Sequence, residues 1–169
     1  MSTPIKPELG ETPQGGVRLE PGLRERWGRQ RMGRVRVPIT IRNSDDLAAV
    51  RRNLISEEQV RSLTVEGLVD TGANFLCLPK SMVQRLGLVY RETLLVRTAN
   101  GPVNRNLFVG AEVGIQGRSL PSAVMEIDED MPPLIGVLVL EMLDFVVDPG
   151  GERLIPNPEH GGDWMADIY

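Results

Sequence analysis

The sequence is short of residues on which several kinds of protein depend. Its 169 residues include one cysteine, Cys77, and one histidine, His160, which excludes an internal disulfide and a metal site built from cysteines alone. No apolar run reaches the roughly 20 residues of a membrane-spanning helix, and the first residues lack the apolar core of a signal peptide. We therefore expect a cytoplasmic protein with no metal ion, no cofactor and no membrane partner.

Length and charge set further limits. A chain of 169 residues suits one domain and is too short for two duplicated halves with a cleft between them. The formal net charge of −4 at pH 7 argues against a nucleic-acid partner. Residues 1–36 nevertheless carry eight basic and four acidic residues, and four prolines interrupt residues 1–33. We expect a flexible basic N-terminal tail over residues 1–33.

Glycine and proline are frequent, with 18 and 13 residues, which favours short strands and many turns. Alternating apolar residues predict a strand at 34–42, and Pro38 favours an edge position for it. A capping hydroxyl at Ser44 and a capping-box pattern at 56–59 predict a small helical insertion over residues 44–62. Further strands are predicted at 63–69, 75–78, 89–97, 103–115, 119–127, 145–147 and 153–155, with a short helix at 81–86 that ends at Gly87. The apolar run 137–143 fits a strand or a helix equally well.

One segment carries residues that chemistry can use. An apolar strand delivers Asp70 into a tight turn, and Thr71, Gly72 and Ala73 follow it. The Thr71 hydroxyl can tie the turn down, and Gly72 has no Cβ, so another backbone can approach closely. An isolated Asp-Thr-Gly is usually an ordinary turn, so its meaning depends on the surrounding sequence.

The segment resembles the active-site loop of the single-domain, retropepsin-like aspartic proteases, and later features follow in that family's order. Asn100-Gly101 is the strongest hairpin signal in the sequence and lies where the family has its flap. Leu134-Ile135-Gly136 and the apolar run after it match two apolar residues, a glycine and a short helix. The resemblance covers residues 34–156, with a C-terminal tail at 157–169. It implies a mainly β fold, a closed acid-protease barrel with one short C-terminal helix besides the helical insertion.

The resemblance implies an aspartic endopeptidase, a hydrolase of peptide bonds, that works as a homodimer. In that mechanism two aspartates share one proton and activate a water that attacks the peptide carbonyl. The chain has one Asp-Thr-Gly, and Asp148-Pro149-Gly150 cannot replace a second one, because proline lacks the hydroxyl and fixes φ. Each subunit would supply one Asp70, and the partner besides the second copy would be a peptide or protein substrate.

The resemblance also implies a role for each residue of the motif. It assigns catalysis to Asp70, the active-site loop to Thr71, Gly72 and Ala73, the flap tip that closes over substrate to Thr98, Ala99, Asn100 and Gly101, and support beneath the loop to Leu134, Ile135 and Gly136. Two features depart from the viral members of the family. Asn74 and Phe75 stand where those enzymes have acidic residues, and the flap has one glycine where theirs is rich in glycine.

Two other functions stay open on the same fold. The chain could be a peptide-binding module whose aspartates are unused, or a dimerisation domain in which Asp-Thr-Gly only forms a turn. Inhibition by a transition-state analogue would separate the enzyme from the module.

Several residues have plainer interpretations. We expect Cys77 to face the core, the acidic loop 126–130 to be solvated rather than a calcium site, and His160 to be a solvated tail residue. Asp144 and Asp148 are expected to be surface or turn-capping acids. The apolar residues at the end of the sequence, Trp164, Met165, Ile168 and Tyr169, are expected either to dock on the body or the partner subunit, or to belong to a disordered end.

Overall fold

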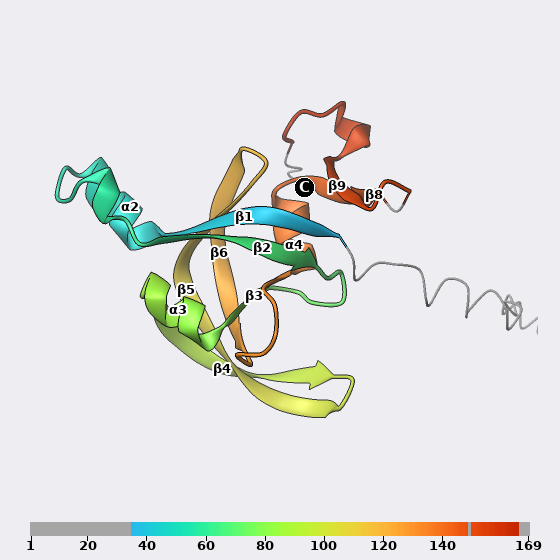
Figure 1. The fold of residues 1–169 in the computed structure, drawn as a ribbon, viewed down its shortest axis with the longest axis horizontal. Coiled ribbons are helices and arrows are strands. Elements are labelled where there is room, and N and C mark those ends of the chain that lie inside the picture. The colour runs from blue at the N-terminus through green and yellow to red at the C-terminus, as the bar shows by residue number, and fades with distance from the viewer. Residues whose placement is uncertain (1–34, 149, 166–169) are drawn as a thin grey trace, which may run out of the picture. The chain divides into compact units, whose positions relative to one another are not determined.

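The computed structural model describes residues 35–148 and 150–165, so the predicted N-terminal tail lies outside it. The chain divides between residues 30 and 31, and every described residue belongs to the second unit. This part is mainly β with short helices (Figure 1). None of the helices in the described ranges is long and apolar enough to cross a membrane.

The described strands and helices follow the predicted order. The strands are β1 (Arg36–Asn43), β2 (Ser62–Val69), β3 (Leu76–Pro79), β4 (Val89–Thr98), β5 (Gly101–Ile115), β6 (Arg118–Ile127), β7 (Leu134–Ile135), β8 (Phe145–Asp148) and β9 (Arg153–Pro156). The helices are α2 (Ser44–Arg51), α3 (Lys80–Leu86) and α4 (Val137–Met142), with the single 3-10 turns η2 (Glu57–Gln59) and η3 (Pro158–His160). The apolar run 137–143, which suited either structure, is therefore helical over its first six residues.

Seven strands form one sheet in the order β1-β2-β7-β3-β6-β5-β4. β1 also pairs with β5, where residues 40–43 lie opposite residues 111–114. The hydrogen bonds therefore run in a closed ring through β1, β2, β7, β3, β6 and β5. β4 pairs with β5 from outside that ring, and the two strands form the long hairpin at the lower right of Figure 1.

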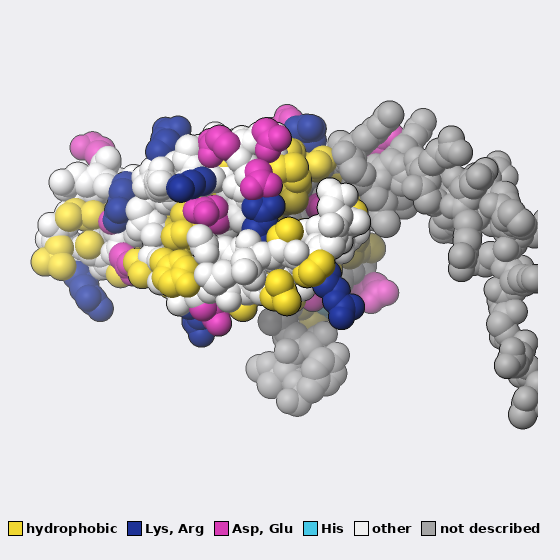
Figure 2. Space-filling view, turned by 90° about the horizontal axis from the view of Figure 1, so that it is seen from below, with side chains coloured by type: hydrophobic (Ala, Val, Ile, Leu, Met, Phe, Trp, Pro, Cys, Tyr) yellow, Lys and Arg dark blue, Asp and Glu magenta, His cyan; other side chains and the backbone are white. Residues whose placement is uncertain are grey.

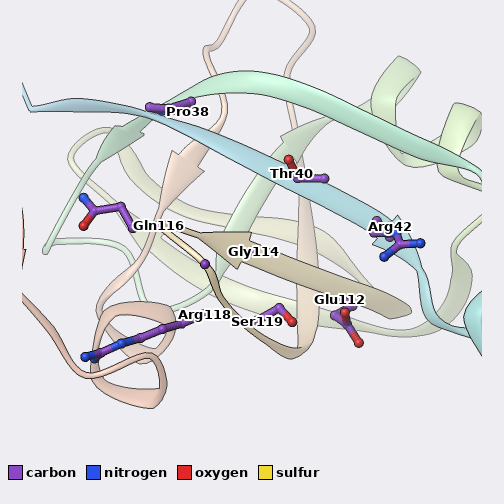
Figure 3. A pocket seen from close by; sticks show the side chains of 9 residues that line it. Pro38, Thr40, Arg42, Glu112, Gly114, Gln116, Arg118 and Ser119 are labelled. Carbon is purple, nitrogen blue, oxygen red and sulfur yellow. The ribbon is translucent and has the colours of Figure 1, made fainter. Parts of the chain in front are cut away.

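The predicted edge position of the first strand is wrong for β1 as a whole, because β1 has neighbours on both sides over residues 40–43. Pro38 lies opposite Glu66 of β2, in the half of β1 that β5 does not pair with. A residue without an N–H is tolerated there because no ladder bond is required on the open side. An open groove lies over the paired ends of β1 and β5 and the turn from β5 to β6 (Figure 3). It is lined by Pro38, Thr40, Arg42, Glu112, Gly114, Gln116, Gly117, Arg118 and Ser119.

The interior of the ring is apolar. Alternate residues of β1 point inward, and Ile39 and Ile41 are 1% and 0% exposed. Leu76 and Leu78 of β3, Leu86 of α3 and Ile135 of β7 are fully buried with them. Burying one such side chain stabilises a fold by about 1.5–3 kcal/mol, so this core holds the strands that carry the candidate site.

The helical insertion between β1 and β2 has a cap that differs from the prediction. The Asn43 side-chain oxygen accepts hydrogen bonds from the main-chain N–H groups of Asp45 and Asp46 at 2.9 and 3.0 Å. Asn43, and not Ser44, therefore caps α2. The Asn43 amide nitrogen also donates to the Leu86 carbonyl at 2.8 Å. An amide can accept and donate at once, so one buried side chain joins the start of α2 to the end of α3.

The capping-box pattern and the glycine that ends the next helix are both confirmed, but the capping-box pattern forms only a single turn. The capping-box pattern at 56–59 forms only η2, in which the Ser56 N–H donates to the Gln59 side chain at 2.9 Å. Gly87 ends α3 with a φ of 61°, in the left-handed region that favours glycine. The insertion is therefore one short helix and one turn.

Candidate active site

The Asp70 loop joins β2 to β3 and is closed by its own hydrogen bonds. The Asp70 carboxylate accepts from the Gly72 N–H at 2.9 Å, and the Ala73 N–H donates to the Asp70 carbonyl at 3.1 Å. A Cβ on Gly72 would lie only 3.1 Å from that carboxylate oxygen. Asp70 is half-buried, whereas Thr71 and Gly72 are exposed. The loop therefore presents a half-buried carboxylate at the end of a buried strand, next to two exposed residues.

A segment far along the chain holds this loop from beneath. The Asp70 N–H donates to the Ile135 carbonyl at 3.0 Å. The N–H groups of Val137 and Leu138 donate to the carbonyls of Ala73 and Asn74 at 2.8 and 3.1 Å. The first N–H groups of a helix have no partner within it, and α4 satisfies two of them with the loop. The loop and the helix thus complete each other's hydrogen bonding.

Gly136 permits this contact because no side chain separates the two segments. A Cβ on Gly136 would lie 2.3 Å from the Phe75 carbonyl oxygen and 2.5 Å from the Asn74 carbonyl carbon. The φ of Gly136 is −78°, which any residue adopts, so the need for glycine comes from space alone. Leu134 and Ile135 are 9% and 0% exposed. The structure therefore places all three predicted support residues against the loop and its strands.

β7 reaches the loop by insertion between β2 and β3. Leu134 and Ile135 lie parallel to Leu68 and Val69 of β2, and Leu134 lies antiparallel to Cys77 of β3. The strands on either side of the Asp70 loop are thus joined through the residues that precede α4.

The predicted flap tip closes the β4–β5 hairpin. Thr98 pairs with Gly101, its hydroxyl donates to the Gly101 carbonyl at 2.7 Å, and it accepts from the Asn100 N–H at 3.2 Å. Gly101 has a φ of 109°, and Thr98, Ala99 and Asn100 are exposed. In Figure 1 the hairpin extends from the ring on the same side as the loop between β2 and β3.

Flap and loop contribute to one apolar surface, which we call the apolar wall. Its buried members are Cys77, Leu107, Met125, Ile127 and Leu134, with Leu68, Ala73, Phe75, Leu94, Val96 and Ala123 partly buried against them. Ala73 and Phe75 come from the Asp70 loop, whereas Leu94 and Val96 come from β4. An apolar surface therefore connects the carboxylate loop to the base of the flap.

Cys77 belongs to this wall and faces the core, as predicted. It is 5% exposed, and its burial, together with the nearby Asp70 charge, raises the pKa of the thiol to about 11. A thiol that stays protonated is a poor nucleophile, so Cys77 acts here as a small apolar residue.

The acidic loop that follows β6 is exposed at residues 128–130, as predicted, and two of its acids also bind neighbouring residues. Both carboxylate oxygens of Asp128 accept from the Arg105 guanidinium at 2.7 Å, and these bonds lower the pKa of Asp128. The Glu129 carboxylate accepts from the Ser81 hydroxyl and N–H, which lowers the pKa of Glu129. The described ranges contain no group of three or more His, Cys, Asp or Glu residues arranged to hold a metal ion.

Two predictions near the C-terminal end are wrong. Asp144 is not a surface acid, because it is only 6% exposed. His160 is not solvated, because its Nδ1 lies 2.8 Å from an Asp144 carboxylate oxygen. Asp148 caps a turn as predicted, since it accepts from the N–H groups of Gly150 and Gly151, both at 3.1 Å. No spacing pattern relates residues 144 and 160, so the pair left no signal in the sequence.

On the face seen from the hairpin side, the described residues gather no large area of charge of one sign. There, basic and acidic side chains lie interspersed with apolar ones (Figure 2). Three apolar side chains of β4, Val89, Tyr90 and Leu95, are more than half exposed.

Comparison with known families adds an independent finding. Residues 58–141 match the family described as aspartyl protease. That range contains the Asp70 loop, the hairpin and the 134–136 segment, and it ends in α4. No curated protein matches the chain. Given this match and the geometry of the loop, the chain belongs to the retropepsin-like aspartyl protease family.

Proposed function

We propose that this chain is an aspartic endopeptidase that works as a homodimer, with one water held between the Asp70 carboxylates of the two subunits. The observation that carries the proposal is the Asp70 loop, in which the carboxylate is bonded to Gly72 and the main chain is bonded to β7 and α4. Asp-Thr-Gly occurs once in the sequence, so the second carboxylate must come from a second copy. We also assign the closed ring of strands to the acid-protease barrel.

The chemistry follows from two carboxylates at close range. Two carboxyl groups about 3 Å apart cannot both be ionised, because their like charges repel, so the pair holds one proton. The ionised carboxylate takes a proton from the water as the oxygen attacks the peptide carbonyl, and the protonated one donates its proton to the carbonyl oxygen. The carboxyl that took the water proton then donates it to the nitrogen of the tetrahedral intermediate, and the other carboxylate takes a proton from a hydroxyl of that intermediate. The C–N bond breaks, the amine and the carboxylic acid leave without an acyl-enzyme, and the pair again holds one proton.

Other parts of the described structure fit this use. Thr71 is exposed next to Asp70, which leaves its hydroxyl available to the partner loop. The β4–β5 hairpin would cover an extended substrate and exclude water. The apolar wall begins at Ala73 and Phe75, so a substrate side chain beside the scissile bond would meet apolar atoms.

The test is cleavage of a peptide library at acidic to neutral pH by the wild type and by Asp70→Asn. Asparagine keeps an oxygen that can accept from the Gly72 N–H, so the loop should persist while the acid–base chemistry is lost. We expect activity to fall by at least about 10²–10⁴-fold. Asp130→Asn, which removes an exposed acid of the loop after β6, is the matched control and should cleave normally.

Mixing subunits tests the dimer separately. If both carboxylates are required, an equimolar mixture of wild type and Asp70→Asn that exchanges subunits freely should retain about a quarter of the wild-type activity. If each chain acted alone, the mixture would instead retain about half of the wild-type activity. Retained cleavage by Asp70→Asn would refute the catalytic assignment, and a dimer that binds peptides without cutting them would favour the binding module.

A further inference from the structure

Residues 157–165, which we call the C-terminal strap, are bonded to the C-terminal end of α4. The Asn157 N–H donates to the Asp144 carbonyl at 3.0 Å. The Trp164 indole N–H donates to the carbonyl of Met142 at 3.2 Å. Met142 is the last residue of α4. The strap therefore satisfies one of the main-chain carbonyls that a helix leaves without a partner at this end, and a second carbonyl just beyond the helix.

Arg118 joins the strap, α4 and the start of β6. Its guanidinium donates to the carbonyls of Leu143, Asp144 and Gly162 at 2.8, 2.9 and 2.8 Å. It also lies 4.9 Å from the centre of the Phe145 ring, and its side chain is only 11% exposed. Figure 3 shows the side chain extending from β6 toward the C-terminal ribbon. A rigid, planar group with several donors suits this bridging position better than a lysine would.

Asp144 is the second residue that joins these segments, and we call Arg118, Asp144 and His160 the C-terminal cluster. Its φ is 56°, an unusual value for a residue other than glycine, and such a backbone persists only where neighbouring contacts hold it. Its buried carboxylate lies 2.8 Å from His160 Nδ1 and 3.8 Å from an Arg118 nitrogen. It also accepts from the Met165 N–H at 3.2 Å. The carboxylate thus binds the strap at two points and faces the cation of β6.

The opposite end of α4 carries the Asp70 loop. Val137 and Leu138 donate hydrogen bonds to that loop at the N-terminus of the helix. At its C-terminus, Arg118 and Trp164 donate to the carbonyls of residues 142–144. A helix of six residues is only about 9 Å long. Val139 and Leu140 are buried between the two ends. A shift at the strap end would therefore be transmitted to the loop.

We infer that Arg118, Asp144 and His160 are positioning residues for the active site: by fixing the end of α4 to the strap, they hold the other end of the helix under the Asp70 loop. The inference rests on the proposed function for its effect on catalysis. Its effect on the geometry of the loop can be measured without a substrate.

The experiment compares His160→Ala with His160→Asn in the full-length chain. An asparagine amide nitrogen can occupy the place of Nδ1 and donate to Asp144, so His160→Asn should restore what His160→Ala loses. Glu159→Ala, at an exposed position of the same strap, is the control. Hydrogen exchange at the Val137 and Leu138 amides reports on the loop contact, and kcat and KM are measured on a cleaved peptide.

In His160→Ala we expect faster exchange at both amides and a fall in kcat of about 10- to 100-fold, because small misplacements of reacting groups have effects of that size. KM should change less than kcat, and His160→Asn should return both readouts to near the wild-type values. If His160→Ala fails to fold, Arg118→Lys, which keeps the charge but loses the fork of donors, is measured in the same way.

The inference fails if the strap amides exchange faster while Val137, Leu138 and kcat stay at their wild-type values. The cluster would then hold only the strap. This outcome is distinct from failure of the proposed function, in which the wild type itself cleaves nothing although the exchange measurements still respond.

Discussion

The carbonyl oxygen of Phe75 lies 2.3 Å from the position that a Cβ would take on Gly136. Nearby, the N–H of Val137 donates to the carbonyl of Ala73, so the two segments touch through their main chains. Only the absence of a side chain at residue 136 allows this contact. The position of Asp70 therefore depends on a glycine that lies far from it in the sequence.

Gly136→Ala should destabilise the fold by about 1–3 kcal/mol, since the added methyl meets main-chain atoms that cannot rotate away. Chemical denaturation measures the change. Gly114→Ala is the control, because its new Cβ would meet no atom closer than 3.6 Å and its φ is not in the left-handed region. Equal midpoints for the two variants would show that the loop and α4 can separate freely.

Asn43→Ala should lower the free energy of unfolding by about 1–3 kcal/mol, because it removes the cap of α2 and leaves polar groups near Leu86 without a partner. Ser44→Ala, at the cap expected from the sequence, should change it by less than about 0.5 kcal/mol. Urea denaturation of both variants distinguishes the two caps. A larger effect at Ser44 would contradict the assignment of Asn43.

The pH dependence of stability should reveal the Asp144 contacts. The hydrogen bond with His160 is the main cause that lowers the pKa of Asp144. A carboxyl whose pKa is lower in the folded state stabilises the fold above its unfolded pKa of about 4, and this contribution disappears as the pH falls through the folded value. The difference in unfolding free energy between wild type and Asp144→Asn should therefore be largest at neutral pH and shrink below pH of about 4. Denaturation curves across that range measure it, and a difference that does not vary with pH would contradict the prediction.

The apolar wall should set the substrate preference. Phe75→Ala should lower kcat/KM by about 10- to 100-fold for peptides with a large apolar side chain beside the scissile bond, since about 1.5–3 kcal/mol of apolar contact is lost. Asn74→Ala, at the neighbouring exposed position outside the wall, is the control. If both variants lose the same activity on all peptides, the wall does not contact the substrate.

Cys77 should resist thiol reagents in the folded protein. Its pKa of about 11 leaves little thiolate at neutral pH, and the thiolate is the reactive form. Mass spectrometry after treatment with iodoacetamide should find Cys77 unmodified until denaturant is added. Rapid modification of the native protein would mean that the wall opens to solvent.

Most of the fold could be predicted because its strands alternate apolar and polar residues and its turns carry glycine. The order of these features in the sequence also pointed to the Leu134–Gly136 segment, which lies against the Asp70 loop in the structure. The bonds that hold the loop could not be foreseen from residue types, because they join main-chain atoms such as the Val137 N–H and the Ala73 carbonyl.

The wrong predictions have separate physical reasons. Asn43 and Ser44 are adjacent and both are good cap residues, so local preference could not choose between them. Pro38 indicated an open strand edge, which is true for only half of β1. Asp144 and His160 meet through the path of the chain after β9, and pairs of this kind have no periodicity to detect.

The contact between residues 73–74 and 137–138 also sets an order of events during synthesis. The ribosome releases the Asp70 segment well before α4, and chains emerge from the N-terminus onward. Until α4 has emerged, the loop lacks the partners of two of its carbonyls. A growing chain therefore carries its aspartate without the support that orients it, so the proposed peptidase activity would begin only after α4 has emerged.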